Sequence, residues 1–177
     1  MSVAMIHDLY AHHHWANRRL LDAATKLGSA AERPVGTQFT APTLVGMFAH
    51  IGDVDALWLA RWKGVPPAPS AMAGVTTLAA LGPHWDAVED EQRRFLEALT
   101  SDALERVVDY TFQGGRPGRL PLAVLLHHVT DHGTHHRSEI ATMITMLGAA
   151  PPPCGVAMYR LLRSGQEREA ASAHGAL

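Results

Sequence analysis

The sequence predicts an all-α fold, a four-helix bundle with one long crossover connection and a short extra helix near the C-terminus. Two observations lead to this prediction. Apolar residues recur at spacings of three and four over four long segments, as they do on amphipathic helices. A proline-rich stretch, residues 65–74, separates the second segment from the third and is long enough to connect opposite ends of a bundle. The 177 residues, of which 47% are hydrophobic, suit one domain with one core.

Start and stop signals place the individual elements. The expected helices cover residues 4–27, 43–63, 77–99, 121–147 and 156–164, and Pro83 is an alternative start for the third. Gly28 and Gly64 stand where glycine often caps a helix. We expect residues 100–105 to be a break and residues 107–112 to be a short strand before the Gly114-Gly115 turn.

Composition excludes several classes of protein. With 15 basic and 17 acidic side chains the formal charge is −2, so no basic field would attract nucleic acid or a membrane surface. No window approaches the roughly 20 apolar residues of a membrane span, and the first residues do not resemble a signal peptide. The single cysteine, Cys154, rules out an internal disulfide and fits a reducing cytoplasm, which is the expected location. We expect residues 1–164 to form the bundle and residues 165–177 a flexible tail.

The chain has 12 histidines beside its single cysteine, which favours a nitrogen-ligated metal or acid–base chemistry. Five of them lie in the segment 121–147. On a helical wheel, His136 lies about 30° and His132 about 70° from the centre of the apolar face, whereas His127, His128 and His135 lie at about 110–150°. At spacing i, i+4, His132 and His136 can direct their ring nitrogens at one ion. The same pattern also suits two half-buried histidines bonded to backbone or water.

A third ligand should come from another helix, and the segment 43–63 offers two residues. His50 lies at the margin of its apolar face, and Asp55 lies more squarely inside that face. A buried carboxylate needs a partner, so Asp55 is either a ligand or a group that orients a ligating imidazole. Periodicity alone does not decide between them.

The first helix contributes further polar side chains. His13 and Asn17 lie on its inward stripe, His13 to line a cavity and Asn17 as a structural hydrogen-bonding residue, whereas His12 and His14 are expected to be solvated. Gly133 costs the fourth helix about 1 kcal/mol relative to alanine, so we expect it to leave room beside the site.

Three motifs occur in order along the chain. The first is the run Trp15-Ala16-Asn17-Arg18-Arg19-Leu20-Leu21, the second is His50, Asp55 and Trp58 followed by Arg61 and Gly64, and the third is His132-Gly133-Thr134-His135-His136-Arg137. Together they resemble the DinB/YfiT-like family of metal-binding four-helix bundles over residues 5–163.

The resemblance implies that His50, His132 and His136 are the metal ligands and that the protein is a homodimer. One departure is Ser138-Glu139, where many relatives carry Gly-Gln. Glu139 would either add a charge near the pocket or be solvated, and we expect it to be solvated.

Three neutral imidazoles would leave a divalent ion, zinc or nickel, with its charge uncompensated and at least one position open. Some similar proteins are metal-dependent transferases for low-molecular-weight thiols. We therefore expect a metal-dependent thiol S-transferase that joins a small-molecule thiol to an electrophilic substrate, in an apolar pocket lined by Trp15, Trp58 and Met143. Cys154 is expected to be a loop cysteine without a catalytic role. The alternatives are a stress-related bundle that binds metal or ligand without catalysis, and a metal-dependent hydrolase.

Overall fold

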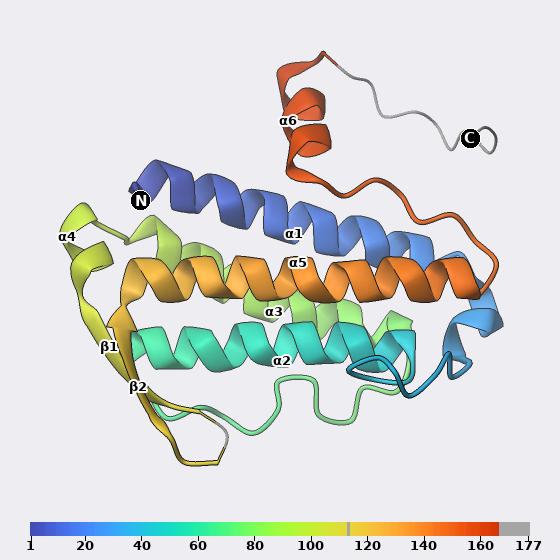
Figure 1. Cartoon of the computed structure of the whole chain (residues 1–177), viewed down its shortest axis with the longest axis horizontal. Helices are drawn as coiled ribbons and strands as arrows, with labels where there is room; N and C mark the ends of the chain where they lie inside the picture. Colours follow the sequence, from blue (N-terminus) through green and yellow to red (C-terminus); the bar gives the residue numbers. More distant parts are fainter. Residues whose placement is uncertain (113, 167–177) are drawn as a thin grey trace.

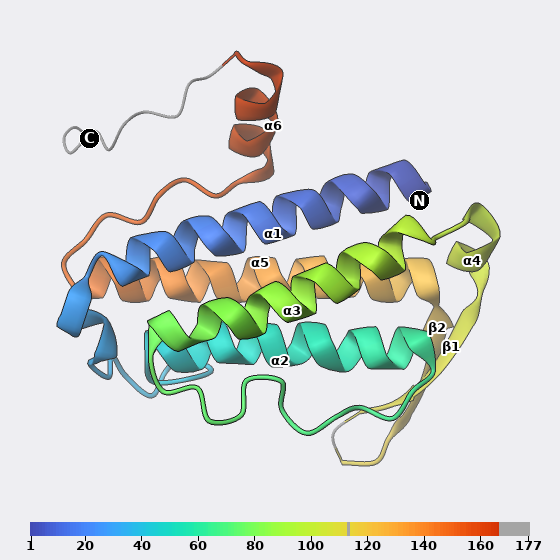
Figure 2. The same ribbon diagram turned by 180° about the vertical axis from the view of Figure 1, so that it is seen from behind.

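The computed structural model describes residues 1–112 and 114–166 and confirms the predicted helical bundle. Its long helices are α1 (Val3–Thr25), α2 (Leu44–Lys63), α3 (Leu78–Glu97) and α5 (Leu122–Met146). Helix α5 packs against α1 on one side and α2 on the other, and α3 covers α1 and α2 from behind (Figures 1 and 2). The part of the expected tail at residues 167–177 lies outside the described residues.

The crossover segment, residues 64–77, runs back along α2 before α3 begins (Figure 2). Gly64 ends α2 in the left-handed conformation with φ 68°, which glycine adopts without strain. Asp53 then holds the returning chain, because its carboxylate accepts hydrogen bonds from the Ser70 hydroxyl at 2.7 Å and from the Met72 backbone N–H at 2.9 Å. Helices α2 and α3 consequently run in the same direction.

Threonine side chains cap the N-termini of α2 and α3. Thr43 accepts a hydrogen bond from the Gly46 N–H at 3.2 Å, and Thr77 accepts one from the Ala80 N–H at 3.3 Å. The third helix therefore begins after Thr77, and Pro83, the alternative start, lies inside it.

Three connecting regions differ from the sequence prediction. The expected break at residues 100–105 contains the one-turn helix α4 (Ser101–Glu105), capped by Thr100. The predicted strand β1 (Val107–Thr111) pairs antiparallel with β2 (Pro117–Pro121), which no sequence signal indicated. Helix α1 ends before the predicted Gly28 cap, and the chain continues as the 3₁₀ helix η1 (Gly28–Glu32).

The short C-terminal helix α6 (Val156–Ser164) has the predicted bounds and lies across the outer side of α1 (Figure 1). Tyr159 contacts the Trp15 ring at 5.3 Å and the His12 ring at 5.6 Å between centroids. His12 Nε2 lies 2.9 Å from the Cys154 carbonyl oxygen, and His14 Nε2 lies 2.8 Å from Gln92 Oε1 on α3. The expectation that His12 and His14 are solvated is therefore wrong, because α6 and α3 cover two further sides of α1.

A polar layer crosses the middle of the bundle and divides the apolar core into two clusters. One cluster surrounds Phe48, Trp85 and Met143, and the other surrounds Tyr10 and Leu126. The buried polar residues between them come from all four long helices: His13, His14, Asn17, Asp55, Glu89, Gln92, Thr130, His136 and Arg137. Within residues 1–112 and 114–166, no helix has both the length and the apolar character needed to span a bilayer.

We expect the free energy of unfolding of the metal-free protein to fall as the pH drops below about 6.5, the ordinary pKa of histidine. Burial lowers the pKa of both His12 and His14 in the folded state. Below pH 6.5 the unfolded chain therefore binds protons that the folded chain does not, and folding loses free energy. Urea unfolding in EDTA at several pH values measures this slope. The variant His14→Gln keeps a donor for Gln92 but does not titrate, so it should show a shallower slope; an equal slope would contradict the assignment.

Candidate metal centre

Three imidazole rings meet where α2 packs against α5. The Nε2 atom of His50 lies 3.3 Å from His132 Nε2 and 3.2 Å from His136 Nε2, and the last two atoms are 3.0 Å apart. Nitrogens bound to a tetrahedral ion at about 2.0–2.1 Å would be about 3.3 Å apart. The donor type, the number of donors and their separations therefore fit a divalent ion such as zinc.

Helix geometry explains why these rings converge. His132 and His136 are one helical turn apart on α5, and α2 brings His50 to them. His136 is 5% exposed and His132 is half-buried, whereas His127 and His135 are exposed. This is the order that the helical wheel predicts.

The environment of the cluster favours the neutral form of two of its rings, those of His50 and His132. Burial, together with the neighbouring histidines, lowers the pKa of His132 to about 3, and burial also lowers the pKa of His50. His136 Nδ1 donates a hydrogen bond to Glu139 Oε2 at 2.6 Å, which leaves the lone pair on Nε2. Neutral imidazoles with free lone pairs are the form that binds metal.

Glu139 is therefore not solvated, and that expectation is wrong. Its side chain is 18% exposed and lies one turn after His136 on the same helix. Partial burial opposes ionisation, but the hydrogen bonds from His136 and Thr40 outweigh it and lower the pKa of Glu139. The helical wheel gives the angle between Glu139 and the centre of the apolar face. The contact with His136 depends instead on the angle between these two side chains, which are three residues apart on the helix.

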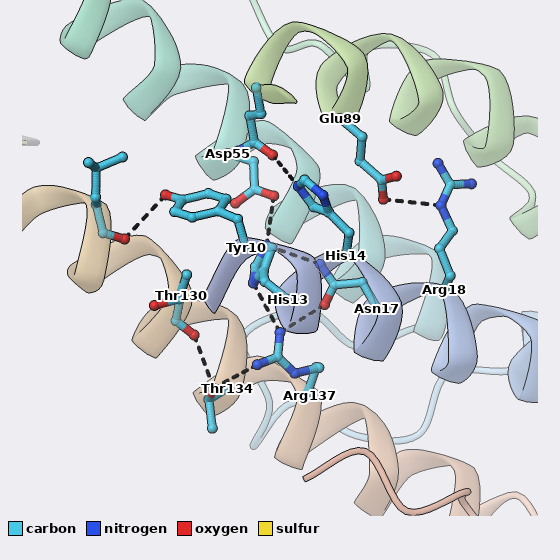
Figure 3. Close-up of polar contacts among 12 residues, drawn as sticks. Tyr10, His13, His14, Asn17, Arg18, Asp55, Glu89, Thr130, Thr134 and Arg137 are labelled. Carbon is cyan, nitrogen blue, oxygen red and sulfur yellow. Dashed lines mark hydrogen bonds and ion pairs between the residues drawn. The ribbon is translucent and has the colours of Figure 1, made fainter. Parts of the chain in front are cut away.

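A second group of polar side chains, which includes His13, Asn17, Asp55 and Arg137, is joined by hydrogen bonds between α1, α2 and α5 (Figure 3). Arg137 Nη1 donates to His13 Nδ1 at 3.1 Å and to Asn17 Oδ1 at 3.0 Å, and its Nη2 donates to Thr134 Oγ1 at 2.6 Å. Because His13 Nδ1 accepts, its Nε2–H is free to donate to Asp55 Oδ2, 3.0 Å away. His13 thus bridges a buried cation and a buried anion.

This network assigns the polar residues that the sequence left open. Asp55 pairs with His13 and lies outside the cluster of three histidines, and its charge raises the pKa of His132 against the lowering effect of burial. Asn17 is a structural hydrogen-bonding residue, as expected. His13 is 0% exposed, and its two ring nitrogens contact Asp55 on α2 and Arg137 on α5.

Two atoms of this region lack a hydrogen-bond partner among the described residues although both are buried. They are Asp55 Oδ1 and His132 Nδ1. A histidine that binds metal through Nε2 carries its proton on Nδ1, so His132 would become a fixed donor on the side of the ring away from the ion.

The three residues expected to line an apolar pocket do not lie together. Trp15 packs against Tyr159 of α6, and Met143 is fully buried in the core. Trp58 remains near the cluster, because its ring contacts His128 at 5.2 Å and the His128 ring lies 6.4 Å from that of His132. A cavity of about 370 Å³ lies between α2, α3 and the crossover segment, away from the three histidines.

The fold and the site together define a class, a crossover four-helix bundle in which two neighbouring helices present three converging imidazoles. The model of the DinB family matches residues 1–169, and the chain belongs to that family. The resemblance seen in the three sequence motifs is thereby confirmed. A search of curated proteins finds no match.

Gly133 leaves room for His13, and we expect the variant Gly133→Ala to lose about 1–3 kcal/mol of unfolding free energy. An added Cβ would lie 2.4 Å from His13 Cε1 and 2.6 Å from His13 Nδ1. Urea unfolding in EDTA measures the loss. In a His13→Ala background the same substitution should cost much less, because its main obstacle is gone. Equal losses in both backgrounds would show that the contact with His13 is not the cause.

Proposed function

We propose that this chain binds one divalent ion through His50, His132 and His136 and uses it to transfer a low-molecular-weight thiol to an electrophilic substrate. The observation that carries the proposal is the convergence of three Nε2 atoms within 3.3 Å of one another. Zinc and nickel are the proposed ions, because both accept imidazole nitrogen. A divalent ion with neutral ligands stabilises a bound thiol as its thiolate, the nucleophilic form.

The chain supplies the surroundings for such a reaction without supplying its own nucleophile. The Cys154 thiol donates a hydrogen bond from Sγ to the Pro152 carbonyl oxygen at 3.1 Å, and burial raises the pKa of this thiol. It also lies next to His12, on the side of α1 that α6 covers. A thiol from solution would therefore be the reacting sulfur, and the half-buried position of His50 and His132 leaves the cluster accessible to it.

A hydrolytic function receives less support from the site. A general base within hydrogen-bond reach of the metal-bound water would assist hydrolysis. The carboxylate of Glu139 accepts a hydrogen bond from His136 at 2.6 Å, and that of Asp55 is paired with His13 at 3.0 Å. Both candidate bases are thus engaged by histidines.

We expect purified protein to contain up to one divalent ion per chain. The variants His132→Ala and His136→Ala should each lose it, because each removes one of the three converging donors. The variants His127→Ala and His135→Ala are matched controls on the same helix and should keep it, since both side chains are exposed. Elemental analysis of untreated protein measures the content. Full metal retention after both inward substitutions would refute the ligand set.

Thiol binding should be detectable before any turnover. When a suitable small thiol is added to the cobalt-substituted protein, sulfur-to-metal charge-transfer absorption should appear, and His50→Ala should weaken it. Conjugation of a model electrophile should follow only with the thiols that produce this absorption. If a broad panel of low-molecular-weight thiols gives neither absorption nor conjugation, the protein is a metal- or ligand-binding bundle without transferase activity.

The homodimer implied by the family resemblance is part of the proposal as well. The structure describes a single chain. Light scattering at micromolar concentration should give twice the chain mass of 19.1 kDa, and a mass of one chain would refute the dimer.

A further inference from the structure

Glu139 and the converging nitrogens lie on opposite edges of the same imidazole ring. Glu139 Oε2 accepts a hydrogen bond from His136 Nδ1 at 2.6 Å. On the other edge of that ring, Nε2 lies 3.2 Å from His50 Nε2 and 3.0 Å from His132 Nε2. The carboxylate therefore acts on the ring that is most deeply buried among the three, at 5% exposure.

The position of Glu139 is fixed from a second direction by the segment before α2. The Thr40 backbone N–H donates to Glu139 Oε1 at 3.3 Å, and the Thr40 hydroxyl donates to Oε2 at 3.3 Å. Thr40 lies three residues before Thr43, the capping residue of α2. Because these contacts come from the protein backbone and a side chain, the carboxylate is held in place whether or not an ion is bound.

We propose that Glu139 is a positioning residue for His136, one that fixes the ring orientation and makes Nε2 a stronger donor to the ion. The inference rests on the proposed metal binding. The hydrogen bond from Nδ1 to the carboxylate directs the opposite nitrogen, Nε2, toward His50 and His132. Such a partner also raises the basicity of the ligating nitrogen, and its loss typically reduces metal affinity about 10–100-fold.

A competing arrangement would make Glu139 itself a ligand of a second ion, together with His135 and His136. The distances favour the positioning role. Ligand atoms of one tetrahedral ion would be about 3.3 Å apart, whereas Nδ1 of His136 and Oε2 of Glu139 are 2.6 Å apart, a separation typical of a charge-assisted hydrogen bond. His135 Nε2 lies 4.0 Å from the same oxygen and its side chain is 70% exposed.

The test compares zinc affinities of purified variants by competition with a chromophoric chelator. Glu139→Ala should bind zinc about 10–100-fold more weakly than the wild type. Glu139→Gln should fall between them, because its amide oxygen still accepts the hydrogen bond but carries no charge. Asp131→Asn removes an exposed acidic charge next to His132 on the same helix and should leave the affinity unchanged. All variants should still bind one ion per chain at saturation.

A second measurement observes the bond itself without metal or activity. In ¹⁵N-histidine NMR spectra of the metal-free protein, the His136 Nδ1–H proton should be protected and shifted downfield. It should move in Glu139→Gln and lose its protection in Glu139→Ala. Urea unfolding in EDTA establishes that each variant folds, and Glu139→Gln carries the test if the alanine variant does not.

The outcomes separate this inference from the proposed function. Wild-type affinity in Glu139→Ala, with one ion bound in both proteins, would overturn the positioning role and leave the metal site intact. Binding of two ions, one of them lost in His135→Ala, would overturn it in favour of the second site. A wild-type protein that binds neither zinc nor nickel would overturn the proposed function and this inference with it.

Discussion

The pairing of buried charges across the middle of the bundle is the constraint on which the rest of the structure depends. Arg137 is 5% exposed and Asp55 is 4% exposed, and an unpaired charge at such depth costs several kcal/mol. His13 joins them, because its two nitrogens contact the guanidinium and the carboxylate at 3.1 and 3.0 Å. One residue from each of α1, α2 and α5 must therefore meet at one level, which fixes how far these helices slide along one another.

The same register places the three converging histidines. His136 precedes Arg137 on α5, and His50 precedes Asp55 by five residues on α2. When Arg137 and Asp55 are joined through His13, the histidine-bearing stretches of α2 and α5 lie opposite each other. Glycine is needed at position 133 because the His13 ring occupies the space that a larger residue's side chain would fill. The hydrogen-bond network thus fixes the relative positions of α1, α2 and α5. The apolar clusters on either side of it bury the apolar surface that stabilises the helices.

Sequence reasoning predicted the elements that depend on local signals. Helix α2 ends at Gly64 and α6 has its predicted bounds, because caps and glycines act within a few residues. Strand β2 was missed because its sequence, PGRLP, is poor in strand-forming residues and is held by pairing with β1. The site was predictable on α5, where His132 and His136 share one helix. It was ambiguous on α2, where His50 and Asp55 point about 140° apart and only the packing of α2 against α5 decides which of them approaches the pair.

The arrangement of charge around the three histidines suits the proposed ion, which neutral ligands would hold. The two carboxylates that could neutralise the charge of the ion act indirectly. Glu139 acts through the ring of His136, and Asp55 raises the pKa of His132 from within the core. Both are held by other groups, so neither is free to occupy a coordination position. The ion would keep its place by neutral donors and keep its attraction for an incoming anion. A carboxylate in direct contact would strengthen metal binding but weaken that attraction, so indirect carboxylates suit the proposed function, in which a retained ion binds an anionic sulfur.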